Sequence, residues 1–292
     1  MNQHGTWYDD VLPADRLDGL AGDPAGVPCF TALDLPDDEA SLIDEKYHDG
    51  EAEIYDSYCE IPRYREAESW IVPWLDTAVP AGIVLDVGTG TGRVAAALQR
   101  PDRRLIAVDR SVEMLARARA RLDPRRSVAL RSDARTLPIA SGSVDAAVCS
   151  GVLHHLPHWP DAVLELARTL RPGGRLVVRE PNARYPEHWF APLENLLERA
   201  FRPADRPGPT EESLSPTEYP IDPATLATVA RVAGLRRVFE GSAMFLGSLA
   251  LPDRMPGHRS YYAAANLVDR AVLRLRPHSR GALTLSVWSK VG

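Results

Sequence analysis

Cysteine is scarce in this sequence, and no long stretch of it is apolar. Cys29, Cys59 and Cys149 stand far apart without a C-x-x-C pair, which argues against a disulfide framework and a thiolate zinc site. No apolar run approaches the ~20 residues of a membrane-spanning helix. The first residues, MNQHGTWYDD, lack the basic start and apolar stretch of a signal peptide. We therefore expect a cytoplasmic protein without membrane contact.

Lysine is scarcer still, because 32 of the 34 basic residues are arginine. Charge is also uneven along the chain: residues 1–80 contain 19 acidic and 4 basic side chains, a net charge of -15, against -6 for the whole chain. The remainder is therefore basic, at +9, but its arginines form no dense tract and the acidic first quarter would repel a phosphate backbone. Nucleic acid is not an expected partner.

The 292 residues, 45% of them hydrophobic, suffice for one large folded domain with an appendage. After residue 80, short apolar runs alternate with helical segments, which is typical of parallel strands covered on both faces. The runs occupy residues 83–87, 105–108, 128–130, 144–149 and 176–178. Connections between parallel strands are almost always right-handed, so this alternation predicts an α/β fold with a doubly wound, mostly parallel sheet.

Other segments depart from this alternation. The first forty residues have no period and are expected to form loop, irregular cover or disorder, whereas residues 41–75 have a helical pattern. These observations divide the chain into an N-terminal extension and helical cover, residues 1–80, and a main domain, residues 81–292. An insertion at about residues 183–221 follows the fifth run, before a final helix–strand–helix–strand ending.

The stretch VLDVGTGTGR, which begins at Val84, is the most informative part of the sequence. A strand there turns through three glycines into a helix, so the backbone can approach a ligand closely. The G-x-G-x-G spacing differs from a dinucleotide fingerprint, which needs a third glycine where Arg93 stands. Asp86, just before the loop, would repel a pyrophosphate and attract an ammonium group.

Two further carboxylates end the next two predicted strands. Asp109 can accept hydrogen bonds from both hydroxyls of a ribose, and Asp133 can accept one from an adenine amino group. Because the carboxyl ends of parallel strands meet at one edge of the sheet, three successive strand ends offer sites for an amino acid moiety, a ribose and a base.

These motifs together resemble the class I S-adenosylmethionine-dependent methyltransferases. VLDVGTGTG, IAVDRS, RSDARTLP, CSGVLHHL and LRPGGRLVVREPN occur in the family's order, within about residues 80–182. The resemblance implies a Rossmann-like sheet of seven strands with an antiparallel last hairpin, formed by residues 235–239 and 283–288. It implies S-adenosylmethionine as the cofactor. The implied cofactor-binding residues are Asp86, Gly88, Thr89, Gly90, Gly92, Asp109, Arg110, Asp133, Ala134 and Ser150.

Candidates for catalysis lie after the fourth and fifth runs. His154 or His155 could be a general base beside the methyl group, or could cap or pack the loop. Glu180 could accept a proton or position a substrate, or could be a hydrogen-bonded structural carboxylate. His154 and His158 have the spacing of a metal pair, but Pro157 intervenes and no third ligand is evident, so no metal is expected.

Aromatic side chains that precede the first predicted strand or follow the fifth are candidates for the acceptor pocket or for core packing. In the insertion they are Tyr185 and Trp189, with His188 between them in sequence. Before the first strand, Tyr47, Tyr55 and Tyr58 could cover the cofactor. Arg63 could pair with the cofactor's carboxylate or form a surface ion pair.

The expected activity is methyl transfer to a small molecule, with oxygen ahead of nitrogen or carbon as the target. The Asn-Pro-Pro-Tyr motif of nucleic-acid amino methyltransferases and the Pro-Cys nucleophile of cytosine C5 enzymes are absent from the sequence, as is an Asp-Asp-Asn metal cluster. The excess of arginine suggests a GC-rich bacterial genome and a role in secondary metabolism. Two alternatives keep the same pocket: cyclisation or rearrangement without net methylation, and cofactor binding without turnover. A nicotinamide oxidoreductase is a more distant alternative.

Overall fold

A computed structural model describes residues 6–18, 26–186, 190–201, 219, 221–252, 255–275 and 280–292 of the chain. One mixed sheet runs through the molecule, in the order β1-β2-β5-β4-β3-β6-β7-β9-β8. The strands are β1 (Leu17–Asp18), β2 (Cys29–Ala32), β3 (Gly82–Val87), β4 (Arg103–Asp109), β5 (Ser127–Arg131), β6 (Val144–Ser150), β7 (Leu170–Pro181), β8 (Leu235–Ala243) and β9 (Leu283–Lys290).

Six neighbouring strands, from β2 to β7, are parallel, which confirms the expected doubly wound α/β fold. β9 lies antiparallel between β7 and β8, so the two C-terminal strands supply the expected antiparallel ending. The expected number of seven strands needs correction. β1 and β2 extend the sheet beyond β5, and Cys29 of β2 pairs in register with Ala129 of β5. The sequence of β1 and β2 has no strand period, so these strands were not predicted.

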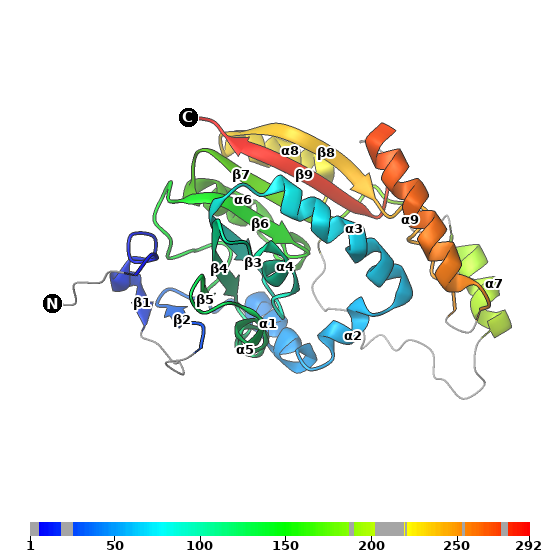
Figure 1. Ribbon diagram of the computed structural model, residues 1–292, viewed down its shortest axis with the longest axis horizontal. Helices are drawn as coiled ribbons and strands as arrows, with labels where there is room; N and C mark the ends of the chain where they lie inside the picture. Colours follow the sequence, from blue (N-terminus) through cyan, green and yellow to red (C-terminus); the bar gives the residue numbers. More distant parts are fainter. Residues whose placement is uncertain are drawn as a thin grey trace.

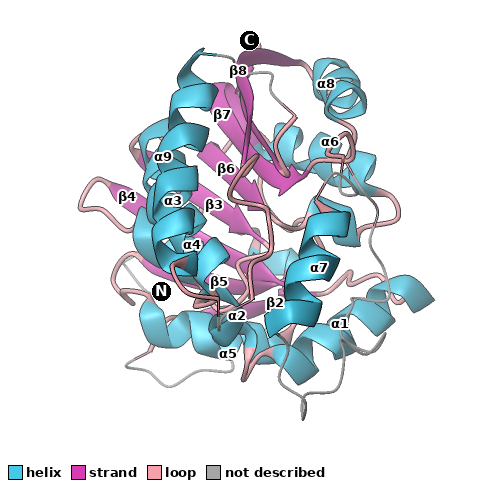
Figure 2. Cartoon of the chain, turned by 90° about the vertical axis from the view of Figure 1, so that its right-hand side faces the viewer, coloured by secondary structure: helices cyan, strands magenta, loops and turns pink. Residues whose placement is uncertain are grey.

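Helices cover both faces of the sheet (Figures 1 and 2). The α-helices are α1 (Glu39–Glu51), α2 (Tyr55–Cys59), α3 (Pro62–Ala78), α4 (Arg93–Leu98), α5 (Val112–Arg121), α6 (Trp159–Thr169), α7 (Ala191–Phe201), α8 (Pro223–Val232) and α9 (His258–Leu275). Two short 3-10 helices are η1 (Ala14–Arg16) and η2 (Leu153–His155). None of the helices in the described part of the chain has both the length and the apolar character needed to cross a membrane.

Side chains alternate between two hydrophobic cores, because successive residues of a strand point to opposite faces. In β3, Leu85 packs with α6 and α8, whereas Val84 packs with α3, α4 and α9. Figure 2 shows these two helical layers on opposite sides of the strands. Val11 and Leu12 are buried in the first core, so part of the N-terminal segment is an irregular cover, as expected.

Helix ends follow the sequence signals. Ser111 caps α5 by accepting a hydrogen bond from the Met114 N–H at 3.0 Å, and Asp222 caps α8 with Pro223 at its first position. The helical pattern of residues 41–75 becomes α1, α2 and α3. Figure 1 shows α1 and α2 beneath the central strands, and α1 packs against α5. The cover therefore lies near the edge of the sheet where the parallel strands end.

Candidate cofactor and acceptor site

The glycine loop after β3 forms one wall of a cavity of about 780 Å³. Gly88 and Gly90 line it, with φ angles of 64° and 53° that favour glycine. A Cβ on Gly88 would lie 2.2 Å from Val152 Cγ2, so the loop needs glycine there to pack against the loop after β6. A Cβ on Gly90 would meet only Tyr55 Cε1, at 4.0 Å, so Gly90 leaves its backbone open to a ligand.

Asp86 does not line this cavity; it is fully buried behind the loop. Its carboxylate accepts a hydrogen bond from the Thr89 hydroxyl at 2.7 Å, and Thr89 also lies outside the lining. Burial raises the pKa of Asp86 to about 7, although the hydrogen bond from Thr89 opposes this. The structure therefore shows Asp86 and Thr89 holding the loop and does not place Asp86 beside a ligand's ammonium group.

Gly92 also has a packing role. Its φ of 81° and the 2.8 Å separation between a Cβ placed there and Ala118 Cα show that α4 begins in contact with the backbone of α5. Gly92 is not part of the cavity wall. Of the three glycines that the sequence predicts for cofactor binding, two line the cavity and the third positions the helix behind them.

Asp109, at the end of β4, lines the cavity beside the glycine loop. One carboxylate oxygen accepts a hydrogen bond from Gly90 N at 2.7 Å and the other accepts one from Ser111 N at 2.9 Å. Burial raises its pKa, while these two N–H groups lower it. These two N–H groups fix the carboxylate at the cavity wall, and each of its oxygens keeps a second lone pair that a ribose hydroxyl could use.

The expected adenine site is more crowded than its sequence suggests. Ala134 and Asp133 line the cavity, but Asp133 already accepts hydrogen bonds from Arg135 Nε and Nη2, both at 2.9 Å, and from Arg110 Nη1 at 3.0 Å. Burial raises the pKa of Asp133, but Arg135 and Arg110 lower it by more than burial raises it. The pKa therefore lies below its ordinary value. Arg110 lines the cavity while linking Asp133 to Glu45 of α1.

Ser150, at the end of β6, has a buried hydroxyl with no hydrogen-bond partner among the described residues. It does not line the cavity. Cys149 before it is fully buried in the core, as expected of a small apolar side chain. Binding at this strand end therefore depends on the residues that follow, beginning with Gly151.

Glu180 organises the loop after β6. Its side chain is fully buried and accepts hydrogen bonds from the backbone N–H groups of Val152 and Leu153, both at 2.9 Å. His154 Nδ1 lies 2.8 Å from its other oxygen. In the neutral imidazole, a hydrogen bond to a carboxylate places the proton on Nδ1 and leaves Nε2 as an acceptor. His154 lines the cavity, whereas Glu180 does not, so Glu180 acts on the loop and on His154 rather than on a ligand.

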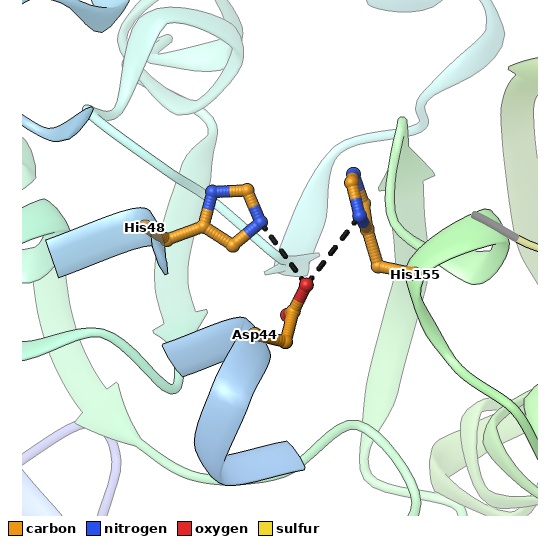
Figure 3. A group of neighbouring side chains, drawn as sticks. All are labelled: Asp44, His48 and His155. Atoms are coloured by element: carbon orange, nitrogen blue, oxygen red, sulfur yellow. Dashed lines mark ion pairs between the residues drawn. The ribbon is translucent and has the colours of Figure 1, made fainter. Parts of the chain in front are cut away.

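His155 also lines the cavity, with its ring centroid 4.0 Å from that of His154. Burial and the neighbouring His154 lower the pKa of His155 to about 4. Figure 3 shows Asp44 of α1 between His155 and His48, with Asp44 Oδ1 3.5 Å from His155 Nδ1 and from His48 Nε2. Asp44 and His48 were not predicted from the sequence. Their i, i+4 spacing puts them on one helix face, but nothing in the sequence shows which face meets the cavity.

Helices α1 to α3 complete the cavity with aromatic side chains. Tyr47, Tyr55 and Tyr58 all line it, which agrees with the predicted cover. Arg63 lines it too, with its guanidinium 4.6 Å from the Tyr64 ring centroid. Tyr185 lies elsewhere, with its hydroxyl 2.5 Å from that of Ser248. His188 and Trp189 lie outside the described residues. His158 is exposed and is not part of the lining.

A glycine loop and a carboxylate at successive strand ends, under a helical cover, are typical of nucleoside-binding proteins of the doubly wound class. A model of the methyltransferase domain family matches residues 85–178. Residues 85–178 thus form a methyltransferase domain, and this match supports the predicted resemblance to the class I S-adenosylmethionine-dependent methyltransferases, with S-adenosylmethionine as the cofactor.

Curated relatives resemble part of the chain. Identity is 40% over 114 residues with a methyltransferase from Mycobacterium bovis, covering 38% of this chain and 42% of the relative. The identity is 39% over 98 residues with the malonyl-[acyl-carrier protein] O-methyltransferase of Xylella fastidiosa, covering 32% of this chain and 33% of that relative. The identity is 36% over 114 residues with the ubiquinone/menaquinone biosynthesis C-methyltransferase of Rubrivivax gelatinosus, covering 39% of this chain and 44% of that relative. The matches thus span less than half the length of these relatives.

Solved structures resemble more of the chain at lower identity. The [4+2]-cyclase SpnF superposes with a TM-score of 0.58 and 19% identity, covering 88% of this chain and 99% of that one. This likeness supports the fold alone.

Proposed function

We propose that this protein transfers a methyl group from S-adenosylmethionine to an oxygen of a small, largely apolar acceptor, as a tailoring step in bacterial secondary metabolism. The observation that carries the proposal is one cavity that unites Gly90 and Asp109 with His154 and with the tyrosines of the cover. The excess of arginine over lysine supports the bacterial setting.

The cofactor would lie along the carboxyl ends of β3, β4 and β5. Gly88 and Gly90 leave room for its amino acid part and Asp109 accepts from its ribose hydroxyls. The adenine would lie beside Ala134, where Arg110 and Asp133 are already paired. Asp133 would then contact an adenine amino group only if one of its arginine partners moves, because both oxygens are occupied.

The acceptor would lie between the cover and the loop after β6. Tyr47, Tyr55, Tyr58, Ile61 and Tyr64 supply an apolar and aromatic wall there. Pockets for small molecules commonly combine such walls with a few polar groups that fix orientation. An elongated nucleic acid would meet the acidic α1 and α2, so the lining favours a small ligand.

His154 is the polar group that we assign to the acceptor. With Nδ1 bound to Glu180, its Nε2 can accept a hydrogen bond from an acceptor hydroxyl and hold that oxygen in line with the methyl carbon and the sulfur. Glu180 is then a positioning residue. In-line displacement depends mainly on this alignment, so misplacement by about 1 Å can cost about 100-fold in rate.

Calorimetry tests the cofactor placement. Gly90→Val should abolish S-adenosylmethionine binding, because its side chain would project into the cavity from a backbone with a φ of 53°. Gly142→Val is the matched control: Gly142 has a similar φ of 66° and open space around it, and it lies outside the cavity lining. The control should lose stability but retain binding. Normal binding by Gly90→Val would contradict the placement.

Radiolabelled cofactor tests turnover on a panel of phenols, aromatic amines and 1,3-diketones. We expect labelled product and S-adenosylhomocysteine, with the highest rate for a phenol. His154→Ala should lower kcat about 100-fold and leave the cofactor Kd within about twofold, whereas His158→Ala, an exposed histidine of the same loop, should match the wild type. An equal loss in both variants would contradict the role of His154.

A second function with the same pocket is cyclisation or rearrangement without net methylation, a chemistry that the fold hosts in SpnF. The same assay separates the two, because a cyclase converts its substrate without releasing S-adenosylhomocysteine. Cofactor binding with neither kind of product from any acceptor would instead favour a protein that holds the cofactor without turnover.

A further inference from the structure

One cluster of side chains in the cavity takes no part in the proposed methyl transfer. Asp44 and His48 lie one turn apart on α1, and His155 lies on η2 after β6. One ligand atom from each residue lies within 4.8 Å of the other two, and among the described residues these three form a group that could hold a metal ion.

We propose that Asp44, His48 and His155 bind one divalent transition-metal ion at the wall of the cavity. Two imidazole nitrogens and one carboxylate oxygen are a ligand set that Zn²⁺ and neighbouring first-row ions prefer. The sequence predicts no metal, because the pair considered there, His154 with His158, is interrupted by Pro157 and has no third partner. No local pattern shows that Asp44 and His48 of α1 approach His155.

The distances suit a shared cation. Asp44 Oδ1 lies 3.5 Å from His48 Nε2 and 3.5 Å from His155 Nδ1. Four ligands placed about 2.1 Å from a tetrahedral Zn²⁺ are separated by about 3.4 Å. The two Asp44 contacts match this separation, and the two histidine nitrogens, which lie within 4.8 Å of each other, would close the remaining distance around one ion.

The surroundings leave such an ion an open position. All three residues line the cavity, so a fourth ligand can come from water or from an oxygen of a molecule in the cavity. Three protein ligands with one open position are typical of zinc sites that act on a substrate, whereas structural sites are closed by four protein ligands. Asp109, which lies near enough to His48 for their charges to interact, adds negative charge that favours a cation.

A bound ion would also have a structural consequence. A cation held by α1 and by the loop after β6 would join the cover to the sheet beside the acceptor end of the cavity. Metal binding should therefore slow the opening of α1 even when no cofactor is present. This inference does not depend on methyl transfer, because neither the ligand set nor the distances involve the cofactor.

The test uses the full-length protein, freed of metal with a chelator and without an affinity tag. Titration with Zn²⁺ in a calorimeter should give one ion per chain. Co²⁺ should give visible absorption stronger than that of the six-coordinate aqueous ion, as four- or five-coordinate cobalt does. Absence of both signals in the wild type would overturn the proposal.

Variants locate the site. Asp44→Asn, His48→Ala and His155→Ala should each weaken Zn²⁺ binding at least about tenfold. The controls His158→Ala and Glu39→Gln, exposed residues of the same loop and the same helix, should bind as the wild type does. Wild-type binding by the three variants, or equal losses in the controls, would show surface binding instead. Circular dichroism verifies folding, and the Co²⁺ spectrum of the wild type remains decisive if one variant fails to fold.

Discussion

At the residue scale, the carboxylates at the strand ends differ in what they face. Asp109 points into the cavity, whereas Asp86 and Glu180 are buried behind it and bind the two loops that form its walls. A buried carboxylate is costly unless it is hydrogen-bonded or protonated. Glu180 has two backbone N–H donors and His154, while Asp86 has the Thr89 hydroxyl and the backbone of Ala95. This difference makes Asp86 the residue with a testable pH dependence.

Asp86→Asn should reveal that dependence. Burial raises the pKa of Asp86 to about 7 from its ordinary value of 3.8, so the folded state holds the proton more tightly than the unfolded state. The stability that this group contributes is present below about pH 4 and is lost as the pH rises to about 7. The side-chain amide of the variant cannot titrate, but its oxygen can still accept the hydrogen bond from Thr89. The variant should gain stability relative to the wild type over this interval, by up to about 4 kcal/mol.

Urea unfolding of both proteins at pH 4.5, 5.5, 6.5 and 7.5 provides the measurement. Asp102→Asn, an exposed aspartate just before β4, is the control and should show a constant difference from the wild type. A difference between Asp86→Asn and the wild type that stays constant over these pH values would contradict the protonated state of Asp86.

At the scale of elements, α1 is the component that links the N-terminal cover to the nucleoside end of the cavity. Glu45 pairs with Arg110 at 2.8 Å and with Arg131, and Asp38, just before the helix, pairs with Arg135 at 2.8 Å. These arginines follow or end β4 and β5. The acidic character of residues 1–80 and the basic character of the remainder are thus partly explained by pairing within the molecule.

Glu45→Gln should loosen α1. Removing the charge leaves Arg110 and Arg131 without a carboxylate partner on α1, at a cost of about 1.5–3 kcal/mol, the usual range for hydrogen bonds to charged groups. Amide hydrogen exchange in α1 should therefore accelerate about ten- to 150-fold. Glu39→Gln, an exposed glutamate on the same helix, should leave the exchange rates unchanged. Equal rates in Glu45→Gln and the wild type would show that packing alone holds the helix.

At the scale of the whole molecule, the cavity joins the carboxyl ends of the central strands to the N-terminal helices. The loop after β3, the carboxyl ends of β4 and β5, and helices α1 to α3 all contribute to one cavity. A ligand that fills the cavity contacts segments far apart in the sequence, which approach each other only in the folded chain. Binding should therefore stabilise the fold as a unit.

Thermal unfolding checks this expectation. S-adenosylmethionine at about 100 times its Kd should add about 2.7 kcal/mol to the free energy of unfolding and raise Tm accordingly. NADH at the same concentration should leave Tm unchanged, since the third glycine of a dinucleotide loop is replaced by Arg93. A larger shift with NADH would favour the nicotinamide alternative and contradict the cofactor assignment.

Local patterns in the sequence were enough to predict much of this protein. Continuous apolar runs, the glycines of VLDVGTGTGR and the caps Ser111 and Asp222 depend on neighbouring residues, so the doubly wound sheet, the cofactor loop and the position of Asp109 follow from them. The two short strands β1 and β2 have no such pattern. They form because the edge of β5 offers unpaired backbone groups, which is a property of the assembled sheet.

Only the tertiary structure decided which side chains face the cavity. Asp86 lies within the first apolar run and Asp109 follows the second, and the folded chain encloses Asp86 behind the glycine loop while Asp109 lines the cavity. Asp44 and His48 meet His155 because α1 crosses the strand ends, across more than a hundred residues of chain. Sequence periodicity defines the faces of a helix, but the packing of the whole chain selects the face that meets the site.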